Sequence, residues 1–140
     1  MMTSPVKIGN ASGFWGDSID APARLVRQVP DLDYLTLDYL AEVSLSVMAL
    51  QLSRNPDAGY ARDFVDVVRS IAPLWAEGRT TRIVTNAGGL RPMNCARAVA
   101  QVLEECNIRG KKIGVVSGDD VLGQLQETQG EEVKAFTNLD

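Results

Sequence analysis

Acidic side chains follow the short apolar runs of this sequence, where a parallel sheet would present the carboxyl ends of its strands. The candidate catalytic residues are Asp17, Asp38, Glu42 and Asp119. Carboxylates that converge there either raise one another's pKa, which suits acid–base catalysis, or bind a hard cation such as Mg²⁺. Helix capping is the structural alternative, because Asp is favoured at helix starts for local reasons. Both interpretations stay open, and we assign no metal site.

Polar and glycine-rich turns accompany these acids. In an open parallel sheet, ligands bind where the strands end and the loops lead into helix N-termini. Phe14 and Trp15 either flank an apolar substrate or pack in the core, which is the commoner fate of a Trp. The candidate ligand-binding residues are Asn10, Ser12, Gly13, Phe14, Trp15, Gly16, Tyr39, Asn86, Gly88, Gly89, Gly118 and Asp120.

Glycines in two of these turns could bring backbone amides close to a ligand. Gly9, Gly13 and Gly16 are spaced G-x3-G-x2-G, and amides there could bind a phosphate or a carboxylate. The spacing is neither that of a dinucleotide fold nor that of a P-loop, so the cofactor is left open. Turn geometry, with Asp17 as a helix cap, is the alternative.

The run Asn86-Ala87-Gly88 is similar to the N-A-G of short-chain dehydrogenases, but the chain lacks their Tyr-x3-Lys pair. The double glycine Gly88-Gly89 is either a nest of amides for a ligand oxygen or a tight turn.

Several kinds of chemistry are excluded by what the sequence lacks. It has no histidine, so Ser-His and Cys-His nucleophile systems and His-ligated zinc are ruled out within these residues. Cys95 and Cys106 lie too far apart on a helix to pair, and we expect both in small apolar sites. No signal peptide opens the sequence and no apolar run could span a bilayer, so we expect a cytoplasmic protein without a membrane partner.

The composition is that of one globular domain. The chain has 140 residues, of which 45% are hydrophobic and 23% charged, and its formal net charge is −4. Because no surplus of positive charge exists to neutralise phosphates, we expect no nucleic-acid partner. We expect a single α/β domain over residues 1–140.

Strand and helix patterns alternate along the chain. Strands are predicted at 6–9, 34–37, 82–85 and 112–116, and helices at 18–29, 61–78 and 91–107. This alternation predicts parallel strands joined by right-handed helical crossovers. We therefore expect a Rossmann-like, three-layer α/β domain with four main strands, in incomplete form.

Two details of the helices are less regular. Asp17 or Ser18 is expected to cap the first helix, and Pro73 to kink or end the second. Residues 43–52 favour helix but are apolar almost all round, so this segment should pack against a second surface.

Read in order, the turns resemble the N-terminal part of the acyclic terpene utilisation protein A family. The likeness rests on residues 8–18, 33–43, 85–96 and 116–120, and it covers almost the whole chain. It implies a role in the breakdown of acyclic terpenoids or branched acyl-CoAs, with no assigned reaction. Because members are longer, we expect this chain to be an N-terminal fragment that self-associates or binds a companion chain.

Two classes of function follow. In the first, the chain is part of an enzyme, and the acids and loop amides surround an acyl-CoA-type or terpenoid carboxylate ligand. In the second, it is a non-catalytic binding or assembly module that pairs with a companion chain.

Overall fold

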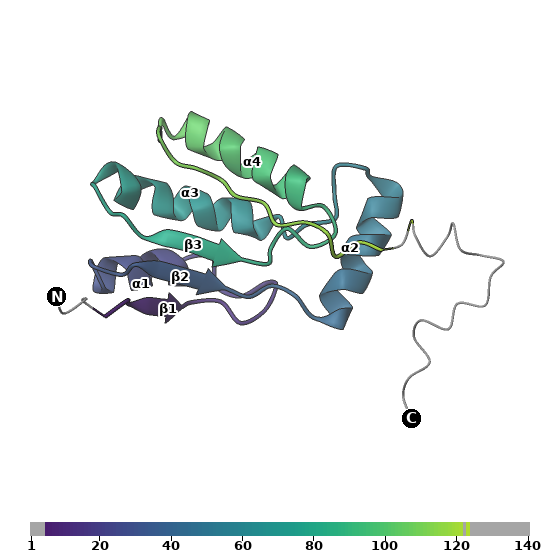
Figure 1. Ribbon diagram of the computed structural model, residues 1–140, viewed down its shortest axis with the longest axis horizontal. Helices are drawn as coiled ribbons and strands as arrows, with labels where there is room; N and C mark the ends of the chain where they lie inside the picture. The colour runs from purple at the N-terminus through teal and green to yellow at the C-terminus, as the bar shows by residue number, and fades with distance from the viewer. Residues whose placement is uncertain (1–4, 122, 124–140) are drawn as a thin grey trace, which may run out of the picture.

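The structure is a computed structural model that describes residues 5–121 and residue 123. Strands and helices alternate over most of this part of the chain (Figure 1). In chain order the elements are β1 (Ile8–Asn10), α1 (Ala21–Gln28), β2 (Tyr34–Leu37), α2 (Glu42–Arg54), α3 (Asp63–Ala76), β3 (Arg82–Thr85) and α4 (Pro92–Glu105).

The strands form one parallel sheet in the order β1-β2-β3. Tyr34 is in register with Ile8 on one side and with Arg82 on the other, so the strands start level. Their carboxyl ends therefore meet at one edge, toward which all the arrows of Figure 1 point. The predicted α/β chain with a parallel sheet is confirmed.

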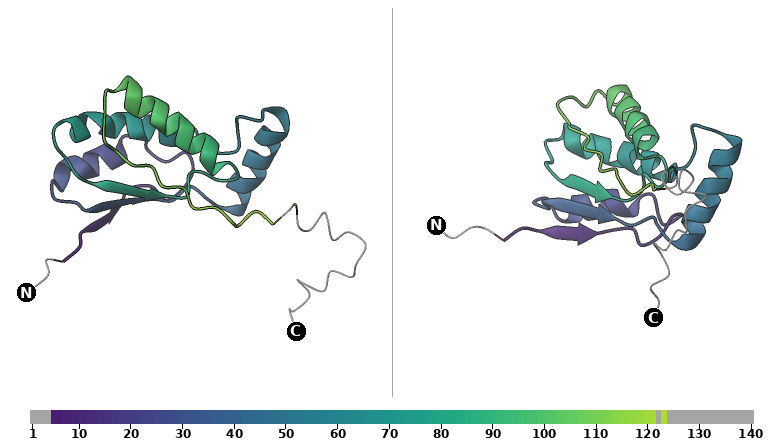
Figure 2. Two further views of the ribbon diagram at one scale, coloured as in Figure 1. Left: turned by 45° about the horizontal axis from the view of Figure 1, so that its top comes forward. Right: turned by 45° about the vertical axis from the view of Figure 1, so that its right-hand side comes forward.

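Helices α1, α3 and α4 cover one face of this sheet (Figure 2, left). Side chains alternate between the two faces of a strand, and on β2 it is Leu35 and Leu37 that are buried beneath the helices. On β1 the inward position is Gly9, where an added Cβ would come within 2.8 Å of Leu25 of α1. The core thus lies between one face of the sheet and a single layer of helices.

The opposite face of the sheet, which we call the open face, carries the alternate residues. Ile8 is 65% exposed there and Val84 is 56% exposed. Arg82 donates a hydrogen bond of 2.8 Å to the Tyr34 hydroxyl and lies 5.4 Å from the centre of that ring. Within the described residues no helix packs on this face, so the expected third layer is not confirmed.

The predicted fourth strand, residues 112–116, is wrong for the structure described. The segment runs beside β3 in both figures, but no ladder hydrogen bond joins the two within the described residues. All of residues 109–121 are exposed, and Val116 is 93% exposed. A parallel strand is stabilised by cover on both faces. Because the described helices cover only one, this apolar segment would bury little surface by pairing with β3.

Helix α3 shows how packing overrides a local signal. Its buried stripe includes Phe64, Val67, Val68 and Ile71, which recur at helical spacing. Pro73 does not end the helix, because α3 continues to Ala76, and the alternative of a kink stays a prediction. The buried residues on both sides of the proline hold the last turn in place.

Helix α2 resolves the ambiguous segment 43–52 as helix. It lies beyond the carboxyl ends of the strands (Figure 1). Met48 is fully buried, whereas Val43 and Leu50 remain exposed. The helix packs through one narrow side, and its outer side stays apolar and uncovered by the described residues.

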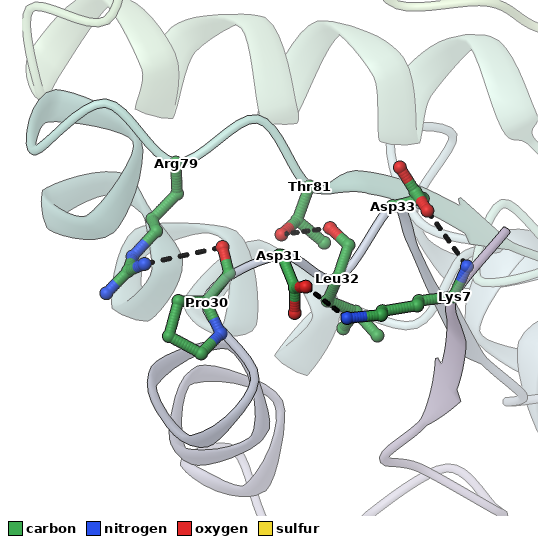
Figure 3. Close-up of polar contacts among 7 residues, drawn as sticks. All are labelled: Lys7, Pro30, Asp31, Leu32, Asp33, Arg79 and Thr81. Atoms are coloured by element: carbon green, nitrogen blue, oxygen red, sulfur yellow. Dashed lines mark hydrogen bonds and ion pairs between the residues drawn. The ribbon is translucent and has the colours of Figure 1, made fainter. Parts of the chain in front are cut away.

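Polar contacts tie together the amino ends of the strands (Figure 3). The Lys7 backbone N–H donates to the Asp33 carboxylate at 2.8 Å. The ammonium group of the Lys7 side chain pairs with Asp31. The buried Thr81 hydroxyl donates to the Leu32 carbonyl at 2.9 Å. We call this group, together with the hydrogen bond from Arg79 to the Pro30 carbonyl, the amino-end cluster.

Candidate functional site

Three of the four predicted turns meet at the carboxyl ends of the strands. These turns, residues 10–18, 38–42 and 86–89, are called the carboxyl rim below. The Asp38 N–H donates to the Ser12 carbonyl at 3.1 Å, and the Ser12 hydroxyl donates to the Asp38 carbonyl at 3.4 Å. The Tyr39 N–H donates to Asn86 Oδ1 at 2.8 Å. The parallel register therefore brings these turns together, as a common edge requires.

Asp38 and Asn86 form the polar centre of the rim. Asn86 Nδ2 donates to Asp38 Oδ1 at 2.7 Å, and the Leu40 N–H donates to the same oxygen at 3.2 Å. The Asn86 amide and then the Leu40 N–H lower the pKa of Asp38, because both stabilise the carboxylate. The Tyr39 N–H makes a smaller contribution in the same direction. A carboxylate with a lowered pKa is a weak base, so the exposed Asp38 carboxylate suits the role of a hydrogen-bond acceptor.

Tyr39 is a core residue rather than an exposed acid. Its ring is buried and meets Phe64 edge to face, with the ring centres 5.9 Å apart. Burial first, and then the negative charge of Asp63, raise the pKa of the Tyr39 phenol. The phenol therefore stays protonated at neutral pH.

The glycine loop after β1 has its amides occupied by carboxylates. The Gly13 N–H donates to Asp17 Oδ2 at 3.1 Å, and the Gly16 N–H donates to Asp63 Oδ2 at 3.1 Å. The hydrogen bonds from Gly13 and then Ser18 lower the pKa of Asp17. Asp63 was missed in the sequence, although an acid at a helix start was a visible signal.

The prediction that Asp17 or Ser18 caps the first helix is wrong. Helix α1 begins at Ala21, and its N-cap residue is Asp20, whose side chain makes no capping hydrogen bond. Asp17 lies too far upstream and closes the glycine loop instead, by accepting from Gly13 and Ser18.

The remaining residues of this loop differ in burial. Ser12 is buried, whereas Phe14 is 60% exposed. Trp15 is partly buried and packs against the core. Asn10 is exposed and accepts a hydrogen bond from the Ser12 N–H at 3.3 Å.

The double glycine lies in a crowded turn. The Gly89 N–H donates to the Asn86 carbonyl at 3.1 Å, and Gly89 has a φ of +49°. A Cβ on Gly89 would overlap Met48 and come within 2.9 Å of the Gly59 carbonyl oxygen, while one on Gly88 would come within 2.9 Å of Pro92. This geometry fits the tight turn better than a nest of free amides.

The other predicted site residues lie outside this centre. Glu42 begins α2 and is exposed. Gly118, Asp119 and Asp120 belong to the exposed segment after α4. Within residues 5–121, no hydrogen bond joins Gly118 or Asp119 to the other turns. Within residues 5–121, Gly118 and Asp119 therefore do not join the fourth turn to the rim by a hydrogen bond.

A surface pocket of about 390 Å³ opens beside the glycine loop. Its lining carries two guanidinium groups and one indole, from Arg54, Arg62 and Trp15. Sequence reasoning identified Trp15 but missed both arginines, because one ends α2 and the other precedes α3, and nothing in their spacing relates them. The full lining is Trp15, Gln51, Arg54, Asn55, Ala58 and Arg62.

The described residues offer hydrogen-bond acceptors and cations rather than a metal cage. No three His, Cys, Asp or Glu side chains among them lie close enough to hold a metal ion. Cys95 is buried, and burial raises the pKa of its thiol to about 11. The exposed Asp38 carboxylate and the arginines of the pocket are groups that can bind a polar or anionic molecule.

No helix in the described part of the chain is long and apolar enough to cross a membrane. No curated protein and no solved structure shows a significant similarity to the chain. Residues 6–140 match the family described as acyclic terpene utilisation family protein AtuA. The match spans nearly the whole chain, and the chain therefore belongs to the AtuA family.

Proposed function

We propose that this chain is a ligand-binding part of an AtuA protein that acts in acyclic terpenoid or branched acyl-CoA catabolism. The ligand is a small molecule with an anionic group, of the acyl-CoA or terpenoid carboxylate type. The observation that carries the proposal is the Asp38–Asn86 pair, which the Tyr39 N–H and the Leu40 N–H hold in a fixed orientation.

The chemistry of this pair favours binding. Asp38 is exposed and its pKa is lowered, so its carboxylate can accept a hydrogen bond from a hydroxyl or an amide N–H of a ligand. Family membership supports the class of pathway, and the exposed Asp38 carboxylate supports the rim as the side of the molecule that contacts the ligand.

The test is calorimetric titration of the whole chain with geranoyl-CoA and, separately, with citronellate. We expect saturable binding of one of them. If it is geranoyl-CoA, whose coenzyme A part carries amide N–H and hydroxyl donors, Asp38→Asn should weaken binding about tenfold. Asp20→Asn is the matched control, since it makes the same change of charge at a side chain without a capping hydrogen bond. Absence of binding by the wild-type chain would overturn the proposal.

A second function, an assembly module, is favoured by the open face of the sheet. All-parallel sheets are almost always covered on both faces, and this one exposes Ile8 and Val84 around the Arg82–Tyr34 pair. Arg and Tyr are enriched at protein interfaces. We propose that another polypeptide supplies the third, Rossmann-like layer, and a second copy of this chain is the first partner to test.

Sedimentation at micromolar concentration tests this second function. We expect association that the double substitution Ile8→Lys, Val84→Lys abolishes, since both side chains are exposed and the charges would face the partner. Arg24→Glu on α1 is the control surface change. A compact monomer at all concentrations would exclude self-association.

A further inference from the structure

We propose that the pocket between the glycine loop and the end of α2 binds an oxyanion, a phosphate or a carboxylate, through Arg54 and Arg62, with the body of the ligand against Trp15. This site lies beside the carboxyl rim and uses residues that the sequence did not point to. The inference deepens the proposed function and rests on it only for the identity of the whole ligand.

The pocket has the size and the chemistry for such a group. At about 390 Å³ it falls in the range of small-molecule sites. A guanidinium matches the geometry of carboxylate and phosphate oxygens and can bind them with two parallel hydrogen bonds. Gln51 and Asn55 add amide groups to the same lining, which contains no carboxylate among the described residues.

Both arginines are available for a ligand. Within the described residues neither Arg54 nor Arg62 forms an ion pair or a side-chain hydrogen bond. Arg69, in contrast, pairs with Glu105 at 2.9 Å, and Arg82 is held by Tyr34. Two like charges that share one pocket repel each other, and an anion between them removes that repulsion.

The glycine-loop amides are poorly placed to take this role. The N–H groups of Gly13 and Gly16 already donate to Asp17 and Asp63. An incoming anion would have to displace a carboxylate and would be repelled by its charge. Arg54 and Arg62, in contrast, line the pocket together with Trp15 of this loop and form no ion pair among the described residues.

Trp15 connects the pocket to the rim. It belongs to the glycine loop, is partly buried against the core and also lines the pocket. An indole held in this way offers a fixed planar surface to an apolar or aromatic group. A ligand anchored on the arginines can therefore lie along the indole toward the rim.

Indole N–H signals in a ¹H–¹⁵N spectrum of the whole chain test this site without an activity assay. The chain has only two tryptophans, Trp15 and Trp75, so Trp15→Phe assigns both signals. The probes are pyrophosphate, coenzyme A and octanoate, with chloride at equal ionic strength as the reference. We expect the Trp15 signal to shift saturably and the Trp75 signal to stay in place, because the Trp75 indole is bound to the Thr81 carbonyl elsewhere.

Charge variants then separate the arginines from general electrostatics. We expect Arg54→Gln and Arg62→Gln each to weaken binding about tenfold, and the double variant about a hundredfold. The double variant Arg24→Gln, Arg27→Gln on α1 has the same net charge and should bind as the wild type does. Equal losses in both double variants, or no saturable shift of the Trp15 signal with any probe, would overturn the inference.

The probes also identify the source of the oxyanion and separate the two proposals. A response to pyrophosphate and coenzyme A supports a phosphate, and a response to octanoate alone supports a carboxylate. If geranoyl-CoA binds the wild type and the Arg54, Arg62 double variant equally well, the inference fails while the proposed function stands. If pyrophosphate binds in an arginine-dependent way but no acyl-CoA or terpenoid carboxylate does, the proposed function fails while this site stands.

Discussion

At the amino end of the sheet Lys7 pairs with Asp31, whereas at the carboxyl end Asp38 is held by the neutral Asn86 amide. Beside that carboxyl end, Arg54 and Arg62 have no charged partner among the described residues. Opposite charges that meet neutralise each other and leave no free charge for a ligand. Charges that are separated, and held by neutral groups, keep their capacity to bind one. The first end therefore has a structural task, and the second is the end at which we propose recognition.

The sharpest test compares one glycine from each end. Gly89 and Gly78 both have positive φ, but a Cβ on Gly89 would overlap Met48, whereas the space around Gly78 is open. We expect Gly89→Ala to lower the free energy of unfolding by about 3 kcal/mol and Gly78→Ala by about 1 kcal/mol. Denaturant unfolding measures both, and equal losses would show that the rim is no more tightly packed than the other end.

A smaller effect is expected from the hydrogen bonds that join neighbouring turns. Asn86→Ala removes the acceptor of the Tyr39 N–H and the amide donor to Asp38, so we expect a loss of about 2 kcal/mol. Thr81→Val at the amino end removes one donor to the Leu32 carbonyl and should cost about 1 kcal/mol. Thermal unfolding of the two variants gives the order, and the reverse order would contradict the comparison.

The causes of two lowered pKa values provide a third test. The hydrogen bond and charge of Lys7 lower the pKa of Asp31, while neutral amides lower that of Asp38, both from an ordinary value of 3.8. Each carboxylate therefore stabilises the fold above that value, and this stability is lost as the pH falls through the lowered pKa.

The salt dependence of the two pKa values distinguishes the charge of Lys7 from hydrogen bonds of neutral amides. Carboxyl ¹³C titrations in low salt and in about 1 M NaCl should show the Asp31 pKa rising toward its ordinary value, because salt screens exposed ion pairs. The Asp38 pKa should stay low. An Asp38 pKa that responds to salt as strongly as that of Asp31 would mean that a cation holds it.

The smallest effect is expected for Lys7→Gln. Exposed ion pairs contribute little to stability. The hydrogen bond from the Lys7 backbone N–H to Asp33 links the two segments, and the substitution retains it. We expect no measurable change in the melting temperature. A clear drop in the melting temperature would show that the Lys7–Asp31 ion pair contributes more to stability than expected for an exposed pair.

Periodicity alone identified most of the elements. The strands 34–37 and 82–85 were predicted with the bounds of β2 and β3, because each is a short β-branched run between turns. The predicted strand 112–116 has the same pattern, yet its cover would have to come from outside the described residues. The local sequence pattern indicates that a segment can form a strand, and tertiary packing decides whether the strand forms.

The site was predictable where strand ends determine it. Asp38 and Asn86 both follow strands, so parallel topology placed them together. Arg54 and Arg62 follow no strand, and they share a pocket because the loop after α2 folds back to α3. The return of this loop depends on its backbone conformation, which includes Gly59 at a φ of +92°. The spacing of residues in the sequence does not determine that conformation.

Gly9 gives β1 a distinct dynamic character. This strand has three residues, and its single inward position has no side chain, so Leu25 of α1 and Leu32 of the following loop pack directly against its backbone. Local opening should therefore start at this edge, and the amides of β1 should exchange with deuterium before those of β2. A molecule that covered Ile8 would slow that exchange, which makes β1 a built-in reporter of occupancy on the open face.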